Sequence, residues 1–127
     1  MTDNGEIHRY IKHSVPSFRV VFYRTDAGNE PVREWLMTLE RDDRKTIGED
    51  IKTLQFGWPI GMPLVRKMEP GLWEIRSHLA HGIARVLITV VENKIVLLHG
   101  FVKKSNKTPV SDLETARRRR ANLLEDN

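Results

Sequence analysis

The sequence of 127 residues contains no cysteine, and this absence excludes disulfide bonds, thiolate metal ligands and cysteine nucleophiles. It also lacks any apolar run close to the ~20 residues that a membrane-spanning helix needs. The first ten residues hold charged side chains and no apolar block, unlike a secretory signal. We therefore expect a soluble cytoplasmic protein without membrane contact.

Motifs of several enzyme classes are absent as well. The chain has no glycine-rich loop that cradles phosphate and no elbow that presents a nucleophilic serine. His78 and His81 have the spacing of metal ligands, but they fall in an expected turn without a third ligand beside them. The sequence therefore predicts neither a metal site nor a cofactor.

Charged residues are unevenly distributed along the chain. Residues 64–120 contain 12 Lys and Arg against 5 Asp and Glu, a net charge of +7. The remaining residues carry a net charge of −3, so the whole chain carries only +4. A one-sided positive field suits a polyanion such as RNA. A solvated surface is the other interpretation of the same pattern.

The N-terminal half of the chain predicts an arm, a strand and a helical hairpin. Residues 1–16 are polar and aperiodic, so we expect a flexible arm before a single domain at residues 17–127. Phe18–Tyr23 is rich in aromatic and β-branched residues, as strands are. Residues 58–70 hold three prolines and are expected to form a loop. Two apolar stripes at helical spacing predict the hairpin, namely Val32, Trp35, Leu36 and Leu39, then Ile47, Ile51, Leu54 and Trp58.

Three strand-like segments and a helix follow. Leu72–His78 and Ile83–Glu92 alternate in polarity, and short connections favour antiparallel hairpins. Ile95–Val102 is almost wholly apolar, as expected of a central strand covered on both sides. A capping-box pattern predicts a helix over Asp112–Leu124. The fold class is therefore α+β, with the hairpin and the C-terminal helix packed on one face of a small, mainly antiparallel four-stranded sheet.

The other face of this sheet carries residues suited to a phosphate. Period-2 alternation puts Glu74, Arg76 and His78 on one side of their strand, and Arg85 occupies the corresponding side of the next. Guanidinium groups donate paired hydrogen bonds to phosphate oxygens, whereas unpaired charge is costly in a core. The alternative interpretation is a sheet-surface ion pair between Glu74 and either arginine.

Five short motifs stand in order at these residues and beyond them. They are Leu72-Trp73-Glu74-Ile75-Arg76, Arg85-Val86-Leu87, Leu98-His99-Gly100-Phe101-Val102-Lys103-Lys104, Thr108-Pro109, and Ala116 with the arginines after it. The ordered set resembles the RelE/ParE toxin superfamily, most closely its phage-related HigB-like branch, over residues 18–124. The resemblance implies a RelE-like fold and the toxin of a type II toxin–antitoxin pair. It also implies an antitoxin partner of the helix-turn-helix kind and cleavage of mRNA on the ribosome, which inhibits translation.

The same resemblance assigns roles to individual basic residues. Carried over position by position, Arg76 and Arg85 would hold and polarise the scissile phosphate. Lys103 and Lys104 match the basic pair that closes the site. Lys67, in the preceding loop, matches a frequently basic position and would bind backbone phosphate.

Two aromatic features bear on how far the resemblance extends. Phe101 lies in a shared motif and would either stack on a base or belong to the core. Some family members have a catalytic tyrosine in or near the last helix, whereas Tyr10 and Tyr23 here lie far upstream. The identity of the general base therefore stays open.

We expect a metal-independent endoribonuclease in which the RNA's own 2′ hydroxyl attacks the adjacent phosphorus. The two strand arginines would stabilise the negative charge of the transition state. Glu74 or His99 would accept the 2′ proton, although a histidine in an apolar strand is more often structural. Lys103 or Lys104 would assist the leaving 5′ oxygen. On this scheme Arg85→Ala abolishes cleavage in a domain that stays folded.

Two other functions are compatible with the sequence. A ParE-like toxin that inhibits gyrase would share the fold and would need no phosphate site on the strands. A non-enzymatic RNA-binding module would adsorb RNA through Arg117, Arg118 and the two arginines after them, and its binding would be salt-sensitive and blind to sequence. The same arginines are also compatible with a solvated helix face.

Overall fold

The structure, a computed structural model, describes residues 18–103 and 107–125. The arm expected over residues 1–16 and the predicted site residue Lys104 lie outside the described residues. In the described part no helix is long and apolar enough to cross a membrane. The elements in chain order are β1 (Arg19–Phe22), α2 (Pro31–Thr38), α3 (Arg41–Gly57), β2 (Val65–Glu69), β3 (Leu72–Leu79), β4 (Gly82–Val91), β5 (Lys94–Lys103) and α4 (Val110–Glu125).

The predicted helices and strands are confirmed, with one exception and one shifted boundary. The exception is β2, which lies in the segment expected to be a loop. The shifted boundary is the start of α4, which begins two residues before the predicted Asp112. Ser111 is therefore inside the helix and is not its cap, and its carbonyl accepts a hydrogen bond from the Thr115 hydroxyl.

The sheet has five strands in the order β1-β5-β4-β3-β2, so the expected four-stranded sheet was one strand short. Strand β2 carries three charged side chains in five positions and lies between prolines, a pattern that resembles a loop. An edge strand tolerates both features because one of its sides faces solvent. β1 pairs with β5 in parallel and the other pairings are antiparallel, so the sheet is mixed.

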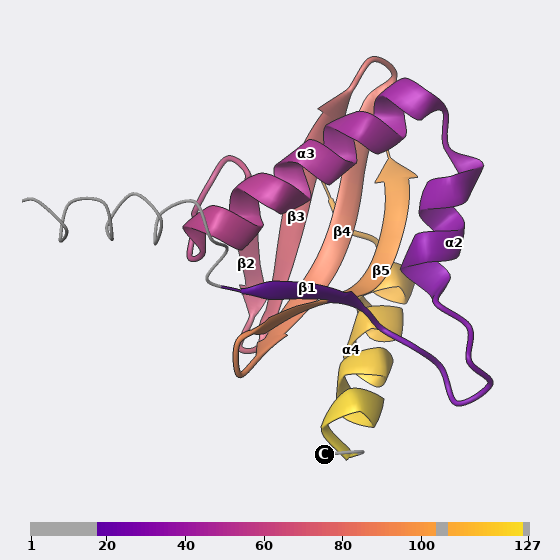
Figure 1. Cartoon of the computed structure of the whole chain (residues 1–127), viewed down its shortest axis with the longest axis vertical. Coiled ribbons are helices and arrows are strands. Elements are labelled where there is room, and N and C mark those ends of the chain that lie inside the picture. The colour runs from indigo at the N-terminus through magenta and orange to yellow at the C-terminus, as the bar shows by residue number, and fades with distance from the viewer. Residues whose placement is uncertain (1–17, 104–106, 126–127) are drawn as a thin grey trace, which may run out of the picture.

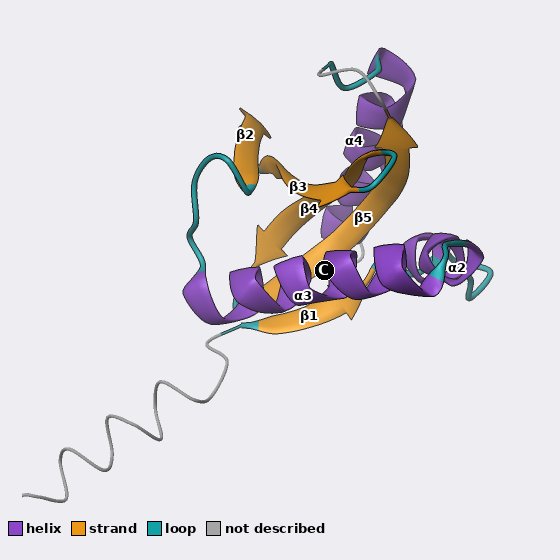
Figure 2. Ribbon diagram, turned by 90° about the horizontal axis from the view of Figure 1, so that it is seen from above, coloured by secondary structure: helices purple, strands orange, loops and turns teal. Residues whose placement is uncertain are grey.

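Helices cover both faces of this sheet. The prediction from the sequence, that all of them pack on one face, is wrong. α2 and α3 lie across one face (Figure 1), and α4 lies on the other side of the strands when the molecule is seen from above (Figure 2). Ile88 and Leu97 pack with α2 and α3, while Leu87 and Leu98 pack with α4. Strands β4 and β5 are thus apolar on both sides, and such strands need cover on both.

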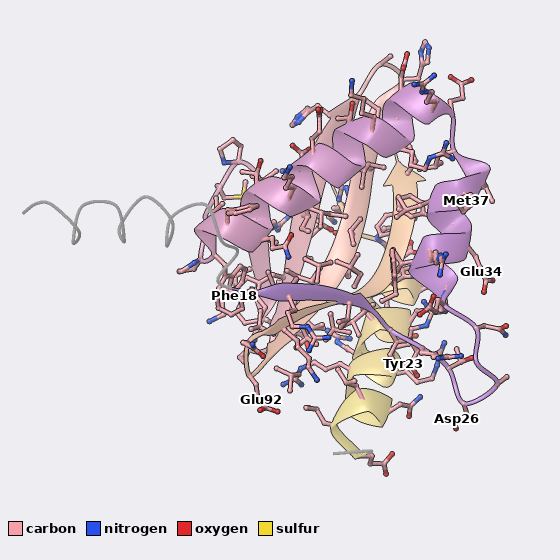
Figure 3. All side chains as sticks on the ribbon, in the orientation of Figure 1. Phe18, Tyr23, Asp26, Glu34, Met37 and Glu92 are labelled. Carbon is pink, nitrogen blue, oxygen red and sulfur yellow. The ribbon has the colours of Figure 1, made fainter. Side chains whose placement is uncertain are left out.

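The main core lies between the sheet and the α2–α3 layer. Val32, Ile47 and Leu54 are fully buried there, because helical spacing brings each apolar stripe onto one face. The cluster beneath α4 is smaller, and Ala116 is the buried residue that α4 contributes to it. Tyr23, which lies past the end of β1 (Figure 3), joins this second cluster and accepts a hydrogen bond of 3.3 Å from Asn122 Nδ2.

A β-bulge interrupts the pairing of β4 with β5. Leu87 is paired with His99 and Ile88 with Leu97, so Leu98 is the extra residue. Leu98 packs in the cluster beneath α4, and His99 contacts α4 through Asp112. The bulge therefore turns two successive side chains toward α4. Gly100 then faces α2, where a Cβ would come within 2.4 Å of the Trp35 ring.

Candidate functional site

Strand register gathers basic residues from four neighbouring strands on the α4 side of the sheet. Directly opposed residues of an antiparallel pair share a face. The opposed pairs are Arg66 with Glu74, Arg76 with Arg85, and Ile83 with both His78 and Lys103. We call the basic members of this set, Arg66, Arg76, His78, Arg85 and Lys103, the cationic face.

A buried ion pair lies at the centre of the cationic face. Glu74 and Arg85 both have 0% exposed side-chain surface, and Glu74 Oε2 lies 3.8 Å from Arg85 Nη1. The Thr108 hydroxyl donates to Glu74 Oε2 and accepts from Arg85 Nη1 at 3.2 Å, so it joins the two charges. Burial lowers the pKa of the Arg85 guanidinium from its usual value, and the Glu74 carboxylate opposes that shift. Arg85 is therefore held inside the protein by a matched charge.

Arg76 is the strand arginine that reaches the surface. Its side chain keeps 14% exposure, and its Nε lies 3.9 Å from Glu74 Oε1. Arg66 and Lys103 are exposed beside it on the same face. A ligand that approaches from solvent meets these three cations. The expected direct contact of Arg85 with a phosphate does not fit its full burial. Glu74 does pair with both arginines, but the alternative of a sheet-surface ion pair is wrong about its location, because Glu74 and Arg85 are fully buried.

His99 occupies a structural position between β5 and α4. Its Nε2 lies 2.7 Å from Asp112 Oδ1, and its Nδ1 lies 3.3 Å from Arg119 Nη1. Arginine can only donate, so Nδ1 accepts and Nε2 carries the hydrogen that Asp112 accepts. Both ring nitrogens are engaged, so this arrangement leaves His99 no position from which to accept a substrate proton. Glu74, the other expected acceptor, is enclosed by Arg85 and Thr108.

The remaining residues of the expected site are divided between the two faces. Phe101 lies opposite Arg85 and is half-buried in the α4 cluster, with its ring stacked on His99 at a centroid distance of 5.6 Å. Lys67 is exposed but lies opposite Trp73. Trp73 packs in the α2–α3 core, so Lys67 is on the side away from the cationic face.

The arginines of α4 mostly attach the helix to the sheet. Arg117 forms an ion pair of 2.6 Å with Glu69 of β2. Arg119 donates to the Leu98 carbonyl at 2.8 Å, and its guanidinium lies 5.9 Å from the centre of the Tyr23 ring. Arg120 Nε donates to Thr89 at 3.2 Å. Arg118 is exposed. Arg117, Arg119 and Arg120 have partners in the sheet, so a solvated helix face does not describe these side chains as a group. RNA binding by Arg117 and Arg118 stays a prediction.

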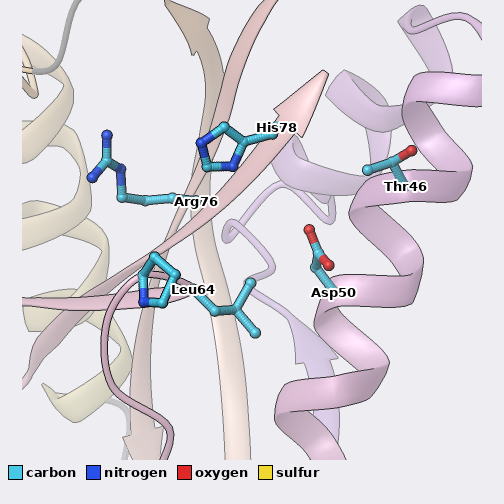
Figure 4. Close-up of a pocket in the computed structure, with 6 residues that line it drawn as sticks. Thr46, Asp50, Leu64, Arg76 and His78 are labelled. Atoms are coloured by element: carbon cyan, nitrogen blue, oxygen red, sulfur yellow. The ribbon is translucent and has the colours of Figure 1, made fainter. Parts of the chain in front are cut away.

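A pocket of about 280 Å³ opens at the edge of β3 beside the cationic face. Figure 4 shows that Thr46 and Asp50 face it from α3 while Arg76 and His78 extend from β3. Pro63 and Leu64 complete the lining. Among residues 18–103 and 107–125, no three metal-ligating side chains come together, here or elsewhere.

Three residues of this region had no assigned role in the sequence. Arg66 was hidden because its segment was expected to be a loop, and a loop has no alternation from which to read a face. Thr108 stands in one of the quoted motifs, but its contact with Glu74 spans 34 positions in the chain. Asp50 reaches the pocket only because α3 lies along the edge of β3. Periodicity along one element reveals none of these long-range placements.

The chain matches the protein family described as "Phage derived protein Gp49-like (DUF891)" over residues 34–121. The matched segment runs from α2 to α4 and includes all residues of the cationic face. No curated protein matches the chain.

Proposed function

The chain belongs to the phage-derived Gp49-like family, which lies broadly among RelE-like type II toxins, and from this premise we propose that it is an mRNA-cleaving toxin. In this proposal it acts as a metal-independent endoribonuclease on mRNA held by the ribosome, and so inhibits translation in the cytoplasm. Its partner is an antitoxin of the helix-turn-helix kind that keeps it inactive.

The observation that carries the proposal is the cationic face. Arg66, Arg76 and Lys103 come from three different strands and present their charges to solvent on one side of the sheet. The nearest carboxylate, Glu74, is buried and already neutralised by Arg85. The exposed charge of these three side chains is therefore positive, as a phosphate-binding surface requires.

Electrostatic stabilisation is the main catalytic contribution in this scheme. The RNA 2′ oxygen attacks the adjacent phosphorus and the bond to the 5′ oxygen breaks, leaving a 2′,3′-cyclic phosphate and a 5′ hydroxyl. Negative charge grows on the phosphoryl oxygens, where Arg76 and Arg66 stabilise it. Lys103 supplies a proton to the departing 5′ oxygen, and solvent accepts the 2′ proton because Glu74 and His99 are both engaged.

Arg85 and Glu74 act as positioning residues. Arg85 holds one oxygen of Glu74 together with Thr108, while the other oxygen faces Arg76 Nε at 3.9 Å. This orients the Arg76 guanidinium before any RNA arrives, and a group positioned in advance needs less reorganisation in the transition state.

The test is the cleavage of a translated mRNA in a reconstituted translation reaction, with the new RNA ends mapped. We expect Arg76→Ala to slow cleavage by roughly 10² to 10³-fold, the usual effect of removing one transition-state donor. Lys52→Ala removes an exposed cation from α3, on the opposite face, and serves as the matched control. Arg66→Ala should slow cleavage more than Lys67→Ala does, because only Arg66 lies on the cationic face.

The same assay separates the proposal from its alternatives. Cleavage must require active translation and must stop when ribosomes are withheld. Equal rates for Arg76→Ala and the wild type would refute the assigned centre. Salt-sensitive RNA binding without RNA products would indicate a non-enzymatic module. Loss of gyrase supercoiling in a parallel assay, with mRNA intact, would indicate a ParE-like toxin.

A further inference from the structure

We propose that the pocket at the edge of β3 binds a single nucleobase that carries an exocyclic amino group, next to the RNA linkage that Arg76 contacts. The inference deepens the proposed function and rests on it in one respect, which is that the phosphate lies on Arg76. It adds a base-reading role for Asp50 and His78.

The size of the pocket suits one planar heterocycle. Its volume of about 280 Å³ is slightly below the ~300 Å³ at which sites for drug-sized ligands begin. Pro63 and Leu64 form an apolar wall, and the His78 imidazole provides an aromatic surface beside it. Unstacked RNA bases are commonly held in this way, between an aromatic ring and apolar side chains.

The pocket exists because β2 is shorter than β3. Pairing between the two strands ends at Val65 and Ile75, and the last bond of the ladder runs from Arg76 N to the Leu64 carbonyl at 2.8 Å. Backbone groups two residues apart on a strand point to the same edge. The N–H and C=O of His78 therefore point to the β2 side beyond the end of β2. A donor and an acceptor next to each other match the edge of a base.

Asp50 supplies the chemical selectivity. Its carboxylate points toward the strand in Figure 4, and no side chain or backbone group of the described residues donates a hydrogen bond to it. A carboxylate only accepts, so it pairs with the amino group of cytosine, adenine or guanine and repels the carbonyl that uracil has in the same place. His78 likewise makes no hydrogen bond or ion pair within the described part of the chain and keeps its ring available for stacking.

The neighbouring cations connect the pocket to an RNA strand. Arg76 lines the pocket and also belongs to the cationic face. Arg76 and His78 are two positions apart on one strand, which separates their Cα atoms by about 7 Å. A nucleotide whose phosphate lies on Arg76 therefore has its base within reach of His78 and Asp50.

The first experiment tests binding without any cleavage. Cytidine and uridine 5′-monophosphates differ at the amino position, and so do adenosine and inosine 5′-monophosphates. In NMR titrations of the whole chain, we expect the amino-bearing nucleotide of each pair to bind about tenfold more tightly and to shift the His78 ring signals. Asp50→Asn should remove that difference. Glu49→Gln removes a negative charge from the neighbouring exposed position of α3 and should keep the difference in affinity between the paired nucleotides.

The second experiment maps cleavage sites in the translation reaction. We expect wild-type cuts to favour amino-bearing bases at one fixed position beside the cut, and Asp50→Asn to reduce that preference about tenfold while cutting continues. Equal binding of the paired nucleotides, or an unchanged base preference in Asp50→Asn, would overturn the inference. Selective nucleotide binding in a protein that never cuts RNA would support the pocket and refute the proposed function instead.

Discussion

The two faces of the sheet are built on different principles. On the face under α2 and α3, the buried side chains are apolar apart from Ser77, at least among the residues that the structure describes. On the face under α4, Glu74, Arg85 and Thr89 are buried together with a smaller apolar cluster. The first face contributes stability through burial of apolar surface. The second face contains charges that must neutralise one another within the fold, and this makes it suited to chemistry and costly to alter.

The largest expected effect is on the charged face. Arg85→Ala leaves Glu74 buried without its fully buried partner and with only Arg76 beside it, and breaking a buried pair in this way costs about 3–5 kcal/mol in the free energy of unfolding. That is a large part of the ~5–15 kcal/mol that stabilises a typical domain. Denaturant unfolding measures it. The sequence alone led us to expect that this variant loses cleavage in a domain that stays folded. From the structure we expect it to lose stability as well.

A double variant separates the charge from the packing. Glu74→Leu with Arg85→Met removes both charges and keeps similar volume, so we expect it to regain most of the lost stability. If the double variant is as unstable as Arg85→Ala, the buried charge is not the cause of the loss.

The apolar face should respond to a cavity. Leu54→Ala removes a fully buried side chain of α3, and we expect the free energy of unfolding to fall by about 3 kcal/mol. Met37→Ala truncates an apolar residue of α2 that is 67% exposed, and it should change the free energy of unfolding by less than ~0.5 kcal/mol. Equal losses in the two variants would show that burial does not govern the stability of this layer.

A smaller effect is expected where α2 touches β5. Gly100→Ala places a Cβ within 2.4 Å of the Trp35 ring, and overpacking of this kind costs about 1–3 kcal/mol. Gly48→Ala is the matched control in α3, because a Cβ there meets nothing within 4 Å and alanine favours the helix. Thermal unfolding should separate them in sign, with the first variant less stable and the second more stable than the wild type.

The smallest effect concerns the exposed ion pair that joins α4 to β2. The hydrogen bond from Arg117 lowers the pKa of Glu69, so the pair adds stability above the unfolded pKa, near ~4.3, and loses it as the pH falls through the lowered folded value. We expect Arg117→Ala to lower the Tm slightly at pH 7 and not at all near ~pH 2. Arg118→Ala should show no such pH dependence. A constant Tm difference across pH would contradict the role of Glu69.

Much of the fold follows from periodicity in the sequence. Helical and alternating patterns place α2, α3 and strands β3 to β5 correctly, and alternation also puts Arg76 and Arg85 on one side of the sheet. Two features escape this reading. β2 is a polar edge strand, and α4 is attached by arginine contacts that look like solvated charge in the sequence.

The candidate site is less predictable than the fold because its decisive contacts are long-range. The buried Arg85 donates a hydrogen bond to Thr108, which comes from a segment beyond β5 and 23 positions along the chain. Whether Asp50 faces a pocket depends on where α3 crosses the edge of β3. Residue types suggest which groups can do chemistry, but only the packed molecule decides which of them meet solvent.

The extra residue in β5 determines on which side of the sheet each later side chain of the strand lies. Because side chains alternate along a strand, a β5 that paired regularly through Leu98 would turn every later residue to the opposite side of the sheet. Phe101 and Lys103 would then point toward α2, and Gly100 would lie beneath α4. The bulge thus decides on which side of the molecule Lys103 lies. A deletion of Leu98 would leave Leu97 and His99 opposite their present partners, Ile88 and Leu87, and would keep that placement.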